Sequence, residues 1–303
     1  MRPTVSPTHA PDLSAYAWDV RRFATVAVIL VVVCGCASVE DGPEATPSES
    51  PTGRVPASPA TTSPSAPEPG TVPPTWLFTR PLPVTDTGFG EVRPTPRELR
   101  VRRFNLPDSI APLPGGGFAS RVDSAPAKVI ARSTWKPGCP VRSDQLDWIR
   151  VAYVGFDGER HSGELLAHED VSADLVRVFG ALWRARFPIE EMRITKAREL
   201  DLEPTGDGNN TGAFVCRPTR GGSSFSEHAY GLAIDVDPFQ NPYHRGEVVI
   251  PELASAYLDR DSERPGMIVD GGPVVAAFDA IGWTWGGRWR SLTDLHHFSR
   301  NGR

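Results

Sequence analysis

Two short stretches of the sequence hold residue types that can bind a metal ion and move a proton. The first is Ser226–Asp237 (SEHAYGLAIDVD), and the second, near the C-terminus, is Asp294–Phe298 (DLHHF). Gly231 permits a turn after His228, and the alternation that follows predicts a strand that turns Asp235 away from the apolar side chains. A neutral imidazole and a carboxylate are suitable zinc ligands.

The second stretch supplies what the first lacks. His297 offers a third ligand, and Asp294 offers a carboxylate that can act as a base. A site with three nitrogen and oxygen ligands and no thiol leaves a fourth position open, as catalytic zinc sites do. Spacing alone also allows other hypotheses, in which His228 caps a turn and Asp235 pairs with an arginine. His296 and His297 cannot both point into one site if the backbone is extended, and spacing does not choose between them.

The elements that must position these residues predict an α+β fold. An alternating strand over 150–156, a turn at Asp157-Gly158 and a returning strand over 163–168 form a hairpin. Apolar residues at helical spacing predict a helix over 172–186, and a short strand follows at 192–195. We therefore expect a small, mostly antiparallel sheet that carries the zinc site and is packed by helices, within a domain spanning 127–303.

The N-terminal residues 1–36 resemble a lipoprotein-type signal segment. Arg21 and Arg22 precede the apolar run 24–34, which fits a signal peptide better than a membrane span. Gly35 and then Cys36 follow this run, and Cys36 is the expected lipidation site; an ordinary cleaved signal and an uncleaved anchor are the alternatives. The sequence thus predicts an extracytoplasmic protein, either lipid-anchored to the outer face of the cytoplasmic membrane or secreted.

Two segments separate the signal from the domain. Residues 37–75 are rich in proline, serine and threonine and hold almost no large apolar residue, so we expect a disordered linker. Residues 76–126 contain too many prolines for long helices and are expected to form an extended arm on the domain surface, without chemistry of its own.

The two cysteines after Cys36 are Cys139 and Cys216. In an oxidising compartment, one disulfide between them is the expected arrangement. Two metal-binding thiols are the alternative, and it is weak because the chain contains no CxxC spacing.

The composition excludes some partners. The 303 residues carry a net charge of −5, and 39% of them are apolar. The chain lacks the excess of basic residues that is typical of nucleic-acid-binding proteins, so no nucleic-acid partner is expected. Membrane contact is expected only through the N-terminal anchor. Nothing in the sequence indicates oligomerisation, so a monomer is expected.

The two motifs together resemble the VanY-like zinc peptidases of bacterial cell walls, which share the fold of lysostaphin-type enzymes and of the hedgehog signalling domain. The similarity extends over about residues 130–300 and rests on Ser226-x-His228-x-x-Gly231-x-Ala233-x-Asp235, Asp294-x-x-His297-Phe298, Asn210-x-x-x-Phe214-x-Cys216-Arg217, Asn241-Pro242-Tyr243 and Gly282-Trp283-x-Trp285-Gly286-Gly287.

The resemblance implies one catalytic Zn²⁺ bound by His228, Asp235 and His297, with Asp294 as the catalytic acid and base. It also implies substrate-binding roles for Arg217 and Ser226. The expected activity is hydrolysis of peptide bonds in peptidoglycan stem peptides, of the L-Ala-D-Glu endopeptidase or D-Ala-D-Ala carboxypeptidase type. The carboxypeptidase branch has glutamate at the position of Asp294, so this residue favours the endopeptidase branch. A non-catalytic wall-binding or signalling module with the same fold is the alternative.

Overall fold

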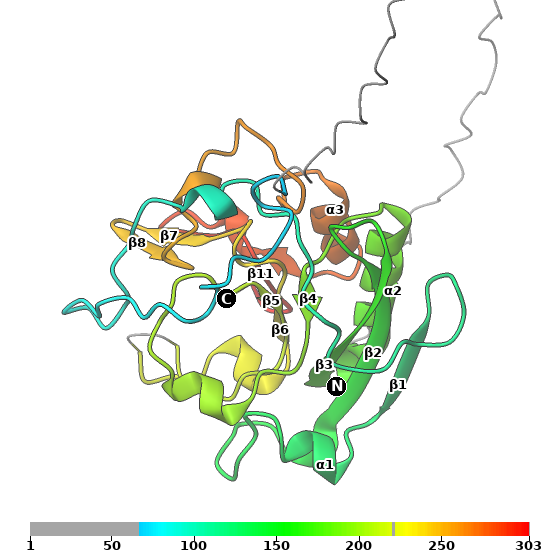
Figure 1. Ribbon diagram of the computed structural model, residues 1–303. Coiled ribbons are helices and arrows are strands. Elements are labelled where there is room, and N and C mark those ends of the chain that lie inside the picture. Colours follow the sequence, from blue (N-terminus) through cyan, green and yellow to red (C-terminus); the bar gives the residue numbers. More distant parts are fainter. Residues whose placement is uncertain (1–66, 220–221, 303) are drawn as a thin grey trace, which may run out of the picture. The chain divides into compact units, whose positions relative to one another are not determined.

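Three antiparallel strands form the sheet that receives the longest helix described. The computed structural model describes residues 67–219 and 222–302, in which β1 (Ser120–Ser124), β2 (Leu146–Val154) and β3 (Arg160–His168) are paired in that order (Figure 1). The predicted hairpin is present, with Gly158 in the left-handed conformation (φ 79°) in its turn. Both strands begin several residues before their predicted starts.

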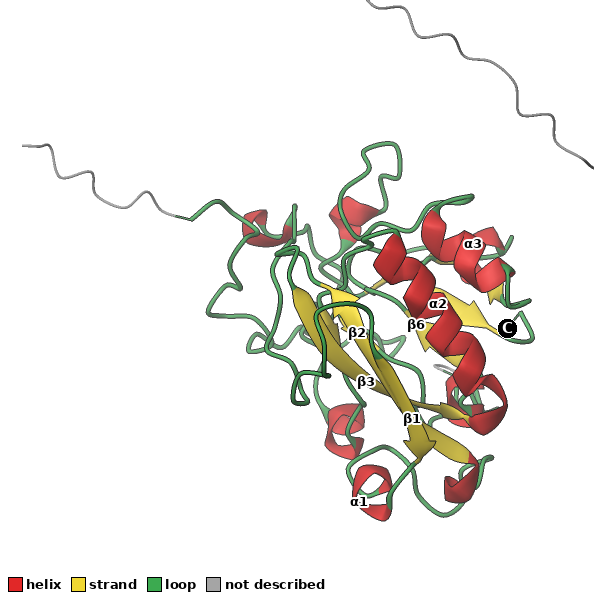
Figure 2. Ribbon diagram, turned by 90° about the vertical axis from the view of Figure 1, so that its right-hand side faces the viewer, coloured by secondary structure: helices red, strands yellow, loops and turns green. Residues whose placement is uncertain are grey.

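The helix α2 (Ser172–Arg184) packs on this sheet and beside α3 (Pro273–Asp279) (Figure 2). It ends before its predicted C-terminus because Arg186 adopts a left-handed conformation (φ 52°), and Pro188 follows. Its buried face repeats at helical spacing, as the sequence predicted, and consists of Leu175, Val178, Phe179 and Leu182.

The other strands are short and form three further sheets, so the single predicted sheet is divided. These sheets have the orders β6-β11-β9, β10-β7-β8 and β4-β5. Only the β4–β5 pair is parallel among the described strands. The strands are β4 (Glu191–Met192), β5 (Asn210–Thr211), β6 (Ala233–Asp235), β7 (Tyr243–Arg245), β8 (Val248–Ile250), β9 (Thr284–Trp285), β10 (Thr293–Asp294) and β11 (His297–Ser299).

Helical turns complete the α+β arrangement. One is the short α-helix α1 (Ala127–Ile130), and the others are 3₁₀ helices at Arg97–Leu99, Ser143–Gln145, Glu169–Val171, Ala197–Asp201, Glu227–Tyr230, Ser255–Tyr257 and Gly286–Arg288.

The main core lies between α2, α3 and the sheets that contain β2, β3, β6 and β11. Ile234 of β6 and Phe298 of β11 are fully buried in it. Phe298 stacks on Phe278 of α3, with 3.9 Å between ring centroids. The apolar faces of the short strands are therefore fixed by the core, and their opposite faces are left for polar side chains.

The arm packs more deeply than an extended surface segment. Its apolar side chains fill a second core together with Phe239, Tyr257 and neighbouring residues; from the arm these are Leu77, Leu82, Leu99 and Phe104. Arg102 is fully buried, and β1, which lies within the predicted arm, pairs with β2. The arm thus supplies both core residues and a strand to the fold.

Cys139 and Cys216 form the expected disulfide, with 5.9 Å between their Cα atoms. It joins the loop after α1 to the segment that precedes the first motif. The predicted signal segment with Cys36, and residues 37–66 of the linker, lie outside the described residues.

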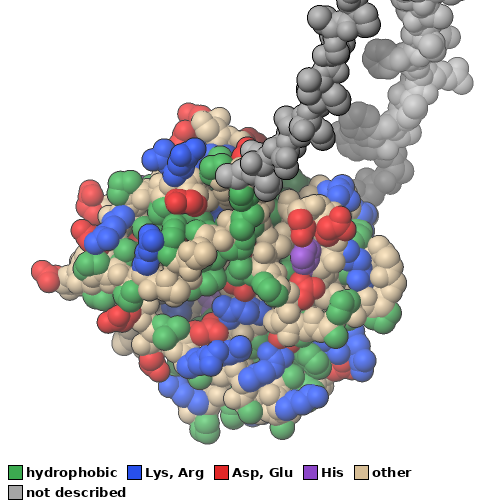
Figure 3. All heavy atoms as spheres, in the orientation of Figure 1, with side chains coloured by type: hydrophobic (Ala, Val, Ile, Leu, Met, Phe, Trp, Pro, Cys, Tyr) green, Lys and Arg blue, Asp and Glu red, His purple; other side chains and the backbone are tan. Residues whose placement is uncertain are grey.

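Within the described part of the chain, no helix has both the length and the apolar character needed to cross a membrane. Acidic and apolar side chains lie among the basic ones on the face shown in Figure 3. This interspersed surface agrees with the modest net charge of −5.

Candidate metal centre

His228 is held by a short 3₁₀ helix, Glu227–Tyr230, that the first motif encodes. The Ser226 hydroxyl caps this helix by accepting a hydrogen bond from the His228 backbone N–H (3.4 Å). Gly231 ends it with φ 70°, and a side chain there would place its Cβ 2.6 Å from the backbone nitrogen of His168. Glycine is therefore required both for the turn and for its close approach to β3.

The His228 ring is oriented by the backbone. Its Nδ1 lies 2.6 Å from the carbonyl oxygen of Ala213, which can only accept, so Nδ1 carries the proton. The other ring nitrogen, Nε2, faces Asp235 and His297. A carbonyl that fixes the tautomer in this way is typical of a metal-binding histidine.

Asp235 and His297 meet because their strands pair. They are direct partners in the antiparallel register of β6 and β11, so their side chains lie on one face. The distance between His297 Nδ1 and Asp235 Oδ1 is 3.1 Å. The apolar partners of the same strands point into the core on the opposite face.

The three ligand atoms are spaced as a metal ion requires. His228 Nε2 lies 3.2 Å from His297 Nδ1 and 3.2 Å from Asp235 Oδ1. Tetrahedral zinc with bonds of 2.0–2.2 Å separates its ligands by about 3.4 Å. All three side chains offer lone pairs to the same point, and a divalent cation satisfies such a set. These residues therefore fit the implied zinc ion.

Histidines control the ionisation of Asp235. Burial alone would raise its pKa, but the charges and hydrogen bonds of His228, His296 and His297 lower the pKa of this carboxyl well below its usual range. Asp235 is therefore ionised, which is the form that binds a metal.

Asp294 lies at the edge of this group on β10. Burial raises the pKa of its carboxyl, and the charge of Asp235 adds to the rise, while the neighbouring histidines oppose it. Its Oδ1 is buried and makes no hydrogen bond, although His296 Nε2 lies 3.0 Å away. A Cβ on Gly286 would lie 2.9 Å from the Cβ of Asp294, so glycine at 286 makes room for the base.

The comparison with protein families agrees with this geometry. Residues 219–300 match the family described as D-alanyl-D-alanine carboxypeptidase. This match supports the VanY-like resemblance that the two motifs carry. The matched segment contains His228, Asp235, Asp294 and His297, and at the family level it indicates a peptidase. Searches of the curated proteins and of the solved structures found no match.

The two consecutive histidines of the matched segment have different neighbours: His297 belongs to the ligand group, and His296 lies beside Asp294. β11 begins at His297, so His296 lies outside the strand and the expected alternation does not apply to it. His296 Nδ1 lies 2.7 Å from the Asn241 carbonyl, and its Nε2 faces Asp294 and lies 3.8 Å from Asp235 Oδ1. Spacing alone did not predict this position of His296 beside the base, although the two consecutive histidines were recognisable as candidates.

The two predicted substrate-binding residues remain predictions. Ser226 is buried and has a structural role, because it caps the helix that carries His228. Arg217 is half-buried, and its Nη1 donates to the Pro218 carbonyl (3.1 Å). It lies just before the VanY-like segment.

The tryptophans divide between the core and the site. Trp283 and Trp285 are buried in the main core. The ring of Trp289 lies 5.4 Å from that of His297, centroid to centroid, and is half-buried. Asp237, at the end of the first motif, points into the interior, where its Oδ1 accepts from the Glu190 backbone N–H (3.1 Å). Burial raises the pKa of Asp237 well above its usual range.

Proposed function

We propose that this protein is an exported zinc peptidase that hydrolyses peptide bonds in the stem peptides of peptidoglycan. The observation that carries the proposal is the buried carboxylate of Asp294 beside the converging group His228, Asp235 and His297. The VanY-like match over 219–300 supports the reaction class, and peptidases of this family are in general zinc-dependent.

The protein's own groups divide the work. His228, Asp235 and His297 would hold the ion, which when bound supplies a Lewis acid for amide hydrolysis. Asp294 Oδ1 is poised to accept a proton from the attacking water and to return it to the leaving amine. Because this carboxyl is buried and its pKa is raised, it binds a proton more readily than an exposed aspartate. His296 lies within reach of Asp294 and can orient it.

The residue at 294 bears on which bond is cut. By the resemblance, aspartate there favours an endopeptidase of the L-Ala-D-Glu type over a D-Ala-D-Ala carboxypeptidase.

We also propose export, with Cys36 as the lipid-bearing residue or with secretion after cleavage. The Cys139–Cys216 disulfide supports an oxidising compartment. The length of the linker over 37–75 would then allow the anchored domain to contact the cell wall.

Digestion of purified muropeptides, followed by mass spectrometry, tests the activity. The zinc-loaded wild type should release products, and Asp294→Asn should lower the rate by about 100- to 10,000-fold, because general acid–base catalysis contributes that much. Products cut beside D-Glu would identify the endopeptidase; loss of a single D-Ala would identify the carboxypeptidase.

A non-catalytic wall-binding module is the competing hypothesis. It predicts that the zinc-loaded wild type binds muropeptides and leaves their masses unchanged. The control is zinc content, because Asp294→Asn should retain the metal while it loses activity. Equal product formation by the wild type and by Asp294→Asn would remove Asp294 from the mechanism.

A further inference from the structure

An open hollow of about 580 Å³ lies beside the metal centre and has no role in the chemistry above. Trp289 connects the two places, because it lines the hollow and its ring lies 5.4 Å from that of His297. The hollow is lined by Arg288, Trp289, Arg290, Ser291 and Gly302. Four of these residues, 288–291, lie in the loop shortly before β10, the strand that carries Asp294.

The backbone of this loop is fixed on both sides. A Cβ on Gly287 would lie 2.3 Å from the ring of Trp285, and one on Gly286 would lie 2.6 Å from the carbonyl oxygen of Asp294. The Arg288 guanidinium donates to Asp270 (2.6 Å) and to Asp279 (2.8 Å). The loop is therefore held against the base without any contribution from a ligand.

Arg290 is the second arginine that lines the hollow, and it takes no part in these contacts. Its side chain is exposed, and within the described residues it makes no hydrogen bond, ion pair or ring contact. Arg288, by contrast, is paired with the carboxylates of Asp270 and Asp279. A guanidinium binds a carboxylate through two parallel hydrogen bonds, so the hollow presents an unpaired partner for an anionic group.

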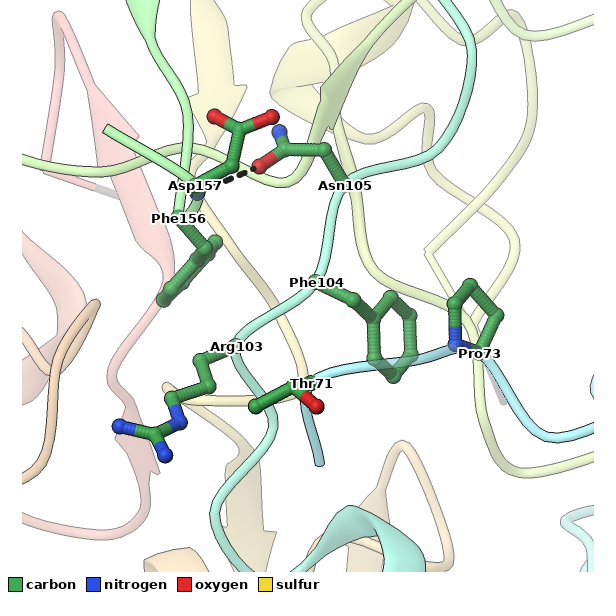
Figure 4. Close-up of a pocket in the computed structure, with 7 residues that line it drawn as sticks. All are labelled: Thr71, Pro73, Arg103, Phe104, Asn105, Phe156 and Asp157. Carbon is green, nitrogen blue, oxygen red and sulfur yellow. Dashed lines mark hydrogen bonds between the residues drawn. The ribbon is translucent and has the colours of Figure 1, made fainter. Parts of the chain in front are cut away.

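A second hollow, of about 460 Å³, offers no such partner (Figure 4). Figure 4 shows Arg103 and Asp157 on its walls, with the rings of Phe104 and Phe156 between them. Arg103 pairs with Glu68, and Asp157 pairs with His161. Both of its charged groups are thus neutralised within the protein.

We propose that Arg290 is a specificity-determining residue that binds a carboxylate of the substrate peptide beside the scissile bond. Trp289 provides the apolar surface between this carboxylate and the metal centre. The proposal rests on the proposed function, and it narrows the substrate to stem peptides that carry a free carboxylate. In stem peptides with lysine at the third position, which are the ones tested, two positions supply one: the α-carboxylate of D-Glu and the C-terminus.

Three synthetic stem pentapeptides test the proposal: one with both carboxylates free, one amidated at D-Glu and one amidated at the C-terminus. Binding is measured by calorimetry on zinc-loaded Asp294→Asn with and without Arg290→Gln, and kcat/KM is measured on Arg290→Gln alone. Loss of a charge-assisted hydrogen bond should weaken binding of the free peptide by about 10- to 100-fold. One of the two amidated peptides should bind the Arg290-containing protein as weakly as the free peptide binds the Arg290→Gln variant. Arg290→Gln should not weaken the binding of that peptide further, and its amidated position identifies the carboxylate that Arg290 binds.

Arg177→Gln is the matched control, because it removes an exposed arginine of α2 that lies away from the hollow. It should leave all three affinities unchanged. If Arg290→Gln leaves all three unchanged, or weakens all three equally, while the wild type cleaves the free peptide, the Arg290 proposal is wrong and the proposed function stands. A wild type that neither binds nor cleaves any of the peptides would overturn both.

Discussion

At the scale of residues, the candidate centre depends on three side chains that arrive from separate places. The 3₁₀ helix supplies His228, while β6 and β11 bring Asp235 and His297 directly opposite each other. Residue types and spacing identified these three from the sequence, but the choice between His296 and His297 came from resemblance. The register of two three-residue strands is set by core packing of Ile234 and Phe298, which spacing cannot express.

Zinc affinity distinguishes the two histidines. His297→Ala removes a lone pair that converges on the ion, so the affinity should fall by more than about 100-fold, the upper range for residues that only support a ligand. His296→Ala should cost about 10-fold or less, because His296 lies beside Asp294 and outside the converging group. Competition with a chromophoric chelator measures both. Zinc loss only in His296→Ala would contradict the ligand assignment.

At the scale of elements, long periodic segments were predictable and short ones were not. The hairpin β2–β3 and the helix α2 have clear periods of 2 and 3.6 residues, and both are present. β9 and β10 have two residues each, too few to show a period, and they are fixed by tertiary contacts instead. The base Asp294 lies on one of them, so its neighbours could not be derived from local pattern.

One contact between elements should depend on pH. His161 of β3 lies between Asp108 of the arm (2.8 Å) and Asp157 of the hairpin turn (3.0 Å). Burial would lower the pKa of His161, but hydrogen bonds to both carboxylates outweigh it and raise the pKa. A raised folded-state pKa stabilises the fold below the unfolded-state value of about 6.5, and this stabilisation is lost as the pH rises through the folded-state value.

Asp108→Asn should therefore destabilise the protein most below about pH 6.5, by about 1 kcal/mol, and less at pH 8. Urea unfolding at several pH values measures the difference from the wild type. Asp174→Asn, the same change at a carboxylate of α2 that pairs with an arginine, is the control. A difference that is constant with pH, or that grows above pH 7, would contradict the role of His161.

At the scale of the whole molecule, the arm is part of the folded unit. Prolines correctly excluded long helices from it, but its burial was not predicted, because isolated apolar residues between prolines do not reveal what they will contact. Arg102 lies fully buried and donates to both oxygens of Glu190 (2.6 Å each) and to the Asp207 carbonyl (2.8 Å). Its backbone N–H donates to the Tyr257 hydroxyl (2.8 Å). A buried charge pair thus joins the arm to the segment that precedes β4.

Replacing only one member of the Arg102–Glu190 pair should lower the stability of the protein strongly. Glu190→Gln or Arg102→Met leaves one buried group without its partner, and each should destabilise the protein by about 3–5 kcal/mol in urea unfolding. The double variant should be less destabilised than the sum of the single variants, because neither charge is then left alone. Arg93–Glu91, an exposed pair in the same arm, is the matched control, and its removal should cost less than about 1 kcal/mol. If the buried pair costs no more than the exposed one, the charge pair does not hold the arm, which then depends on its apolar contacts and its other hydrogen bonds.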